Sequence, residues 1–162
     1  MNTVTAVETV GLVVVSPGDG QPRWSGTSRI TVKARAAQTQ GAFGLILCET
    51  TRGSSPPLHI HHTADEAIWV ISGRIRVRCG EDEFTLEPGA FALLPRGVPH
   101  TFVSEQETTM LGLLTPGGTE AFFDAGPPVT SLTPPPVDGE RMQRAAAEND
   151  NQLVGPPLTL DP

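Results

Sequence analysis

The sequence has no tyrosine, two cysteines and an aromatic content of only 5% among its 162 residues. The missing tyrosine excludes every mechanism that needs a phenol as an acid, a base or a nucleophile. Cys48 and Cys79 are too far apart for a Cys-x-x-Cys pair, which excludes a zinc ribbon and a thioredoxin-like redox motif. Each cysteine falls on an apolar alternation, so we interpret both as small buried hydrophobes rather than reactive thiols.

Positive charge is also scarce, because 11 Lys and Arg residues face 18 Asp and Glu residues and give a net charge of −7. An acidic protein has no electrostatic attraction to phosphate backbones or anionic lipids, so we expect no nucleic-acid partner and no membrane. Long hydrophobic runs are missing as well. The run at 10–15 is too short for a signal peptide, and no stretch approaches the roughly 18 residues of a membrane span. We therefore expect a cytoplasmic location.

Glycine and proline are plentiful, with 17 and 16 residues, and they separate short alternating apolar segments. Strands this close together have no room for the long crossovers that a parallel sheet requires. The sequence therefore predicts an all-β fold, an antiparallel sandwich or jelly roll. The nine predicted strands span residues 29–33, 43–47, 58–62, 66–71, 75–79, 83–86, 90–94, 100–103 and 108–114.

We divide the chain into an N-terminal arm (1–25), a β-barrel (26–117) and a helical, proline-rich C-terminal extension (118–162). Thr119 is predicted to cap a short helix that stops at Gly126, and Asp138 to cap a second helix that runs to about Asn149. The prolines between the two helices predict an extended linker. We expect the second helix to pack outside the barrel or across a dimer, with a loose, solvated tail as the alternative.

Three of the four histidines form, with one glutamate, a predicted metal-ligand set. His59 and His61 are two residues apart on a predicted strand, so both rings leave the same face, about 7 Å apart at the backbone. Imidazoles at that spacing can converge on one ion. Glu66 follows after a turn, and His100 comes from a later strand. Three nitrogens and one carboxylate oxygen suit one divalent transition metal, which we expect to be Fe, Mn, Co, Ni or Zn.

Other polar residues on these strands have simpler interpretations. His62 points away from its two neighbours, which favours a surface position over a ligand. Arg74, Arg76 and Arg78 alternate with apolar residues, and this pattern is typical of a solvated sheet face rather than of an anion site.

The predicted strand at 66–71 is apolar on both faces. Ile68 and Val70 share the face of Glu66, whereas Trp69 and Ile71 lie on the opposite one. We therefore expect this strand to be buried on both faces, with packing against a second sheet or a second subunit as the simplest cause.

Glycines, prolines and the predicted ligands stand in two spaced patterns, Gly53-x5-His59-x-His61-x4-Glu66-x6-Gly73 and Gly89-x5-Pro95-x-Gly97-x2-His100. These patterns resemble the two motifs of the cupin family. At the last position of the second motif, Ser104 stands where the usual residue is asparagine. The chain resembles a small single-domain bacterial cupin, and segments between residues 23 and 158 resemble the quercetinase-like proteins, of the flavonol 2,4-dioxygenase type.

This resemblance implies a jelly-roll barrel with His59, His61, Glu66 and His100 as ligands of one metal ion. It also implies that Glu66 is the general base that accepts the proton of a substrate hydroxyl, and that the protein is a homodimer. Apolar cavity walls from 43–47, 91–93 and Phe102 are expected to suit a flat aromatic or polyketide-like small molecule.

The implied activity is that of a metal-dependent dioxygenase that cleaves a flavonol or a similar enol-bearing substrate of secondary metabolism with O2. Two alternatives stay open: a non-redox metal enzyme (a cyclase, isomerase or decarboxylase) and a binding protein without turnover. Sugar-nucleotide epimerases of the superfamily are disfavoured because they depend on a tyrosine, and thiol dioxygenases because they use three histidines without the glutamate.

Overall fold

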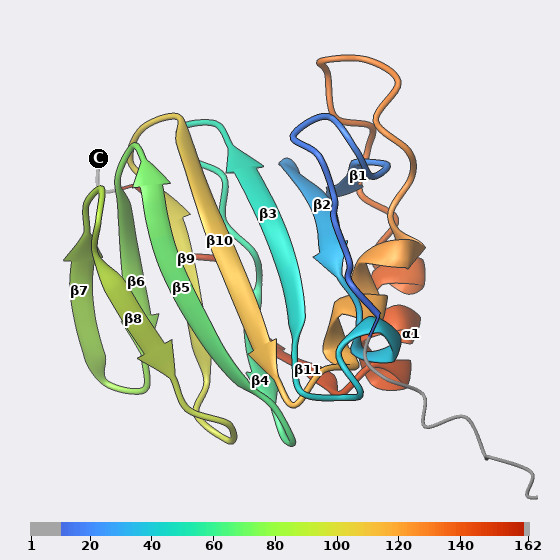
Figure 1. Cartoon of the computed structure of the whole chain (residues 1–162). Coiled ribbons are helices and arrows are strands. Elements are labelled where there is room, and N and C mark those ends of the chain that lie inside the picture. The colour runs from blue at the N-terminus through green and yellow to red at the C-terminus, as the bar shows by residue number, and fades with distance from the viewer. Residues whose placement is uncertain (1–10, 161–162) are drawn as a thin grey trace, which may run out of the picture.

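The computed structural model describes residues 11–160, which form two antiparallel sheets that face each other (Figure 1). Sheet A has the strand order β1-β2-β3-β10-β5-β8, and sheet B has the order β11-β4-β9-β6-β7. The predicted all-β, jelly-roll-type architecture is confirmed. Sheet A consists of β1 (Arg23–Ser25), β2 (Ser28–Ala34), β3 (Gly44–Thr50), β10 (Thr108–Thr115), β5 (Asp65–Ser72) and β8 (Phe91–Leu94), and sheet B of β11 (Asn151–Gly155), β4 (Leu58–His61), β9 (His100–Ser104), β6 (Ile75–Cys79) and β7 (Asp82–Leu86).

All nine predicted strands are present, and two short strands, β1 and β11, were not predicted. Strand β1 has three residues, too few for an alternation, and it exists through its pairing of Trp24 with Arg29 on β2. Strand β11 lies in the segment that was expected to be a C-terminal extension, yet it completes the edge of sheet B beside β4. The arm predicted at 1–25 is thus a strand at its end, and its residues 1–10 lie outside the described residues. The three-part division of the chain stays a prediction.

The hydrophobic core fills the space between the sheets. Ile75 and Val77 of β6 are fully buried, and they pack in one cluster with Ile46 and Cys48 of β3 and Val70 of β5. Alternate residues of β3 and β10 are buried, as a strand with one covered face requires. Full burial of one such aliphatic side chain contributes about 1.5–3 kcal/mol. The prediction that Cys48 is a buried hydrophobe is confirmed, and Cys79 is half-buried.

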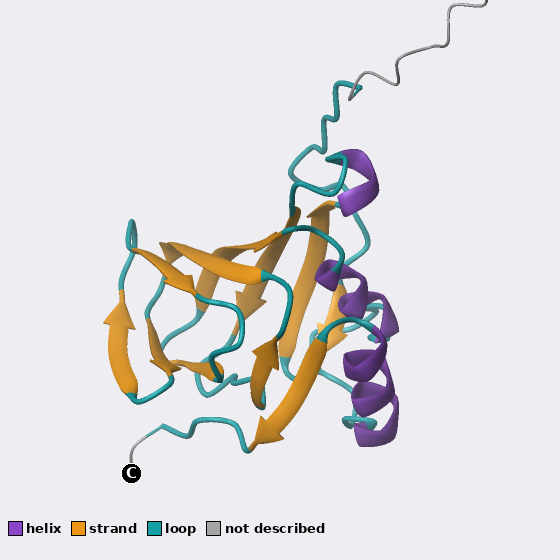
Figure 2. Cartoon of the chain, turned by 90° about the horizontal axis from the view of Figure 1, so that it is seen from below, coloured by secondary structure: helices purple, strands orange, loops and turns teal. Residues whose placement is uncertain are grey.

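Two helices, η2 (Thr119–Ala125) and α1 (Gly139–Glu148), lie beside each other against one end of the sheets (Figure 2). Asp138 caps α1 as predicted, because its carboxylate accepts a hydrogen bond from Arg141 N at 3.0 Å. Thr119 does not cap η2. The capping residue is Gly118, and η2 is a 3-10 helix.

Glu120 instead connects η2 to the segment between β2 and β3. Its carboxylate accepts hydrogen bonds from Gly118 N at 2.6 Å and from Ala36 N at 2.7 Å, where Ala36 begins the short 3-10 helix η1 (Ala36–Gln38). Helix α1 packs on β11 and η2, outside the barrel as expected. Within residues 11–160, no helix has the length and apolar character needed to cross a membrane.

The outer face of sheet A is apolar and exposed at β5 and β8. Trp69 of β5 lies opposite Phe91 of β8, and these side chains are 47% and 59% exposed. Ile71 and Leu93 extend the same exposed face. Only the inner face of β5 packs against sheet B, so the coverage of its outer face by a second subunit stays a prediction.

The outer face of sheet B is charged, as the arginine alternation predicted. Arg74 contacts Glu105 at 2.8 Å, Arg78 contacts Glu83 at 3.0 Å, and Arg76 pairs with Glu83. Each arginine therefore has an acidic partner, which favours a paired, solvated face over an anion site.

Candidate metal centre

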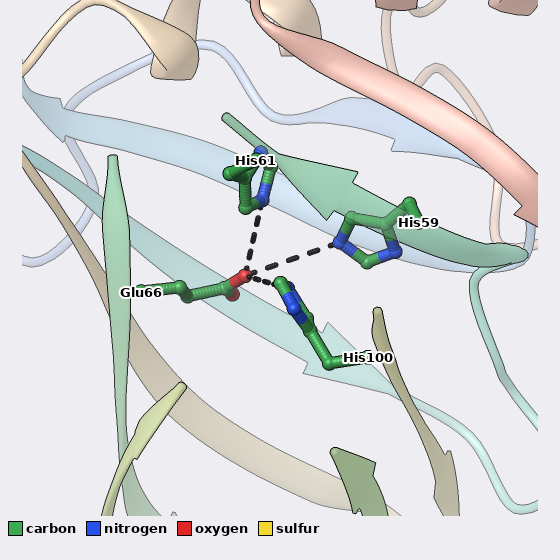
Figure 3. A group of neighbouring side chains, drawn as sticks. All are labelled: His59, His61, Glu66 and His100. Carbon is green, nitrogen blue, oxygen red and sulfur yellow. Dashed lines mark hydrogen bonds and ion pairs between the residues drawn. The ribbon is translucent and has the colours of Figure 1, made fainter. Parts of the chain in front are cut away.

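Four side chains from three strands meet between the two sheets (Figure 3). His59 and His61 project inward from β4, and His100 of β9 is the register partner of His59. Glu66 approaches from β5 of the opposite sheet. One ligand atom from each residue lies within 4.8 Å of the others. The structure thus brings together all four residues that the sequence predicted as ligands.

His62 lies apart from this group, as its position on the strand predicted. Its side chain is exposed, and its Nε2 atom contacts Gln152 Oε1 at 2.8 Å. Ser104, which stands where the cupin motif usually has asparagine, is fully buried at the end of β9. It hydrogen-bonds Thr50 Oγ1 at 2.6 Å, so this position has a structural role.

The turns that precede Glu66 and His100 are held together. Asp65 accepts hydrogen bonds from Arg96 N at 2.9 Å and from the Arg96 guanidinium at 2.9 and 3.0 Å. This arginine holds the pKa of Asp65 at about 2. Gly97 N donates to His61 O at 2.7 Å, and the φ angle of Gly97 is 77°, a conformation that favours glycine. The two turns therefore position the ligand residues that follow them.

A backbone carbonyl orients each of the three imidazoles. The Nδ1 atoms of His59 and His100 lie 2.8 and 2.9 Å from Pro57 O and Val98 O, and Nδ1 of His61 lies 3.3 Å from Asp150 O. A carbonyl accepts only from N–H, so each Nδ1 donates and each Nε2 keeps its lone pair. This arrangement is the one by which proteins orient metal-binding histidines.

All three Nε2 atoms face one oxygen of Glu66. Oε2 lies 3.1 Å from His100, 3.3 Å from His61 and 4.0 Å from His59 (Figure 3). Lone pairs and a carboxylate oxygen in this arrangement repel each other unless a positive charge lies between them. Two ligand atoms of one ion lie about 3–4 Å apart, and the distances from Oε2 to the three Nε2 atoms are close to that range.

The pKa shifts follow from the same contacts. Burial alone would raise the pKa of Glu66, but contacts with His100 and His61 outweigh it and hold that pKa well below its ordinary value. Burial, reinforced by His100, lowers the pKa of His59 to about 4. Burial also opposes protonation of His61, yet the Glu66 carboxylate raises its pKa. Glu66 thus favours a positive charge among the rings, which a proton or a divalent metal can supply. The donor set fits a transition metal of the predicted group.

A cavity of about 100 Å³ extends from this centre and is mostly apolar. Its walls include Ile46 and Phe102, which confirms these two expectations. Phe91 and Leu93 were expected in the wall but lie on the outer face of sheet A, because Ala92 and Leu94 of β8 point inward. The remaining wall is formed by residues such as Ile30, Ile68, Met110 and Leu114.

A second pocket of about 270 Å³ lies beside the cavity, against η2, α1 and the linker between them. The cavity and this outer pocket share five wall residues, which are Ser25, Gly26, Phe122, Phe123 and Met142. None of the cavity residues after residue 117 was predicted. The adjacent phenylalanines of η2 could have indicated this part of the wall. Two neighbouring apolar side chains before a Gly-Pro linker are expected to be buried against another part of the protein.

Comparison with known proteins supports the resemblance that the motifs indicated. Residues 47–115 match the family described as "Cupin domain". The chain is 29% identical over 140 residues to quercetin 2,3-dioxygenase of Bacillus subtilis (strain 168). That alignment covers 82% of this chain and 42% of the relative, so the chain spans less than half of the relative's length.

Solved structures share the fold at low sequence identity. A predicted oxalate decarboxylase from Thermotoga maritima has a TM-score of 0.58 and 17% identity, over 64% of this chain and 98% of that one. A sugar phosphate isomerase of the cupin superfamily from Silicibacter pomeroyi has a TM-score of 0.55 and 20% identity, over 65% and 77% of the two chains. One of these proteins is described as a decarboxylase and the other as an isomerase, so this similarity concerns the fold.

Proposed function

We propose that this protein is a metal-dependent dioxygenase that cleaves a flavonol, or a similar enol-bearing aromatic or polyketide-like compound, with O2. The observation that carries the proposal is the ionised Glu66 facing three oriented Nε2 atoms at the end of an apolar cavity. The similarity to a quercetin 2,3-dioxygenase supports the choice of substrate class.

His59, His61, Glu66 and His100 would hold the metal ion. When bound, a divalent metal supplies Lewis-acid polarisation of a coordinated oxygen and, if redox-active, an electron path to O2. Glu66 has a second role in the proposal, as the general base. Its contacts with the histidines all use Oε2, so Oε1 is the atom that accepts the proton of the substrate hydroxyl.

The cavity supplies position and exclusion of water. Its walls are aliphatic and aromatic side chains, which suit the faces of a planar ring and offer few competing hydrogen bonds. A volume of about 100 Å³ is small for a three-ring compound, so the proposed substrate places its reacting ring there. The rest of the molecule extends past Phe122, Phe123 and Met142 into the outer pocket.

Oxygen uptake with quercetin, on protein loaded in turn with Fe, Mn, Co, Ni and Zn, tests the activity. We expect uptake with at least one metal, and its loss in Glu66→Ala. Glu81→Ala, on the exposed turn between β6 and β7, is the matched control and should retain full activity. If the protein binds metal stoichiometrically yet no metal supports uptake, the dioxygenase proposal fails. Turnover without oxygen would then identify the non-redox alternative, and binding without turnover a carrier or sensor.

We also propose that two copies associate through the outer face of sheet A. Large uncharged side chains on neighbouring strands, Trp69, Ile71, Phe91 and Leu93, are exposed there, and monomers rarely leave such a patch uncovered. An uncharged patch also suits a second copy of a chain whose net charge is −7. Light scattering after gel filtration should give a dimer, and Trp69→Lys a monomer. A monomeric wild-type protein would contradict the proposal. A cytoplasmic location and a role in secondary metabolism stay predictions.

A further inference from the structure

Asn151 is a polar residue in the cavity wall that the roles described so far do not use. It is the first residue of β11, where it is the register partner of His61 on β4. Register partners on neighbouring strands project from the same face of a sheet, so the Asn151 side chain follows His61 inward. It lines the metal-side cavity and is 8% exposed.

The carboxamide of Asn151 has no hydrogen-bond partner within residues 11–160, and its Oδ1 atom is fully buried. The buried Nε atoms of Arg74 and Arg76, in contrast, both contact Glu105 on the outside of sheet B. Asn151 instead faces a mostly apolar cavity. Buried polar groups are nearly always paired, and an aliphatic residue would fill this place without cost.

The turn before β11 holds Asn151 in place. Asp150 adopts a φ angle of +54°, and its carboxylate accepts hydrogen bonds from His62 N at 3.2 Å and Thr63 N at 2.8 Å. The Asp150 carbonyl in turn orients His61 at 3.3 Å. The same turn therefore fixes the amide and the neighbouring imidazole relative to each other, as a binding group beside a reacting centre requires.

We propose that Asn151 is a substrate-binding residue that accepts a hydrogen bond from a second hydroxyl of the substrate, distinct from the one that gives its proton to Glu66. The proposal rests on the proposed function, and it narrows the substrate to a polyhydroxylated planar compound. A neutral amide is suited to this place beside His61, because it accepts a hydrogen bond without adding a further anionic ligand to the metal.

Ligand binding to Asn151→Leu tests the proposal, since leucine has a similar size but no acceptor. Quercetin, which carries several hydroxyls, and 3-hydroxyflavone, which carries only the reacting one, are titrated anaerobically into the metal-loaded protein by calorimetry. We expect the Kd for quercetin to rise about tenfold and that for 3-hydroxyflavone by less than about twofold. Gln152→Leu is the matched control, because Gln152 is the next residue of β11 and its side chain contacts His62 outside the cavity.

Two further readouts separate binding from structure. The metal content of Asn151→Leu should equal that of wild type, and the ligand-free variant should melt at the same or a higher temperature, because an unpaired buried amide has been removed. A lower melting temperature, or equal weakening of both flavonols, overturns the proposal. Asn151→Ala, which cannot clash, replaces the leucine variant if that does not fold.

Failure of the proposed function gives a different result. If wild type binds neither flavonol, the substrate class is wrong, and the melting temperature alone decides the role of Asn151. An unchanged or higher melting temperature for Asn151→Leu supports the role of the amide as a ligand-binding group, and a lower melting temperature contradicts it.

Discussion

The two ends of the cavity are built in different ways. At the end with the candidate metal centre, called the metal end below, four side chains come from β4, β5 and β9, and backbone carbonyls and hydrogen-bonded turns orient them. At the other end, the wall is formed by η2 and α1, which come from the segment after residue 117. The metal end is built for precise donor geometry, whereas the C-terminal wall is shaped by packing. We infer that the first sets the chemistry and the second sets which molecule reaches it.

The largest expected effect is at the metal end. His100→Ala removes one donor and leaves Oε2 of Glu66 without its nearest nitrogen, so metal affinity should fall by more than about a hundredfold. His62→Ala, next to His61 in the sequence but outside the cluster, should bind metal like wild type. Metal content after dialysis, measured by mass spectrometry, checks both variants. Equal metal content in His100→Ala and wild type would contradict the assignment of His100 as a metal ligand.

An intermediate effect is expected where the two ends meet, at Asp150. Asp150→Ala removes acceptors for His62 N and Thr63 N and loosens the carbonyl that orients His61. We expect a loss of about 1–2 kcal/mol in the free energy of unfolding and about tenfold in metal affinity. Asp150→Asn keeps an acceptor and tolerates the positive φ angle, so it should lose less of both. Denaturant unfolding and metal competition measure the two losses, and an alanine variant that matches wild type would show that the turn does not support the site.

The smallest effect on metal is expected in the C-terminal wall. Met142 of α1 lines both the cavity and the outer pocket. Met142→Ala should leave metal content unchanged while it alters the Kd for quercetin by about three- to tenfold, because contact with the ligand's apolar body is lost. The expected loss of folding stability is about 1–2 kcal/mol, since the side chain is only half-buried. A loss of metal in this variant would contradict the separation of the two ends.

The difference between the ends also explains what could be predicted from the sequence. His59, His61, Glu66 and His100 stand at fixed spacings between glycine and proline turns, so the local pattern is enough to bring them together. The same turns delimit the nine predicted strands. No comparable pattern marks β11, whose five residues form a strand only because β4 offers a free edge. Asn151 could not be found for that reason.

Two local errors have physical causes as well. On β8 the run Phe-Ala-Leu-Leu has no polar residue to mark its faces, and its bulkiest members, Phe91 and Leu93, turned out to point outward. At η2, Thr119 is a good capping residue by type, but the chain turns one residue earlier at Gly118, whose positive φ angle of 133° permits the bend. In both places the tertiary structure decides between options that the sequence leaves equal.

We propose above that His59, His61, Glu66 and His100 hold one metal ion at the end of the cavity. Anomalous diffraction from crystals of metal-loaded protein, recorded at the absorption edge of the bound element, tests it directly. We expect one strong peak per chain, among the three Nε2 atoms and the Glu66 carboxylate, and no peak there in His100→Ala. A peak elsewhere, or none in protein shown to contain stoichiometric metal, would contradict it.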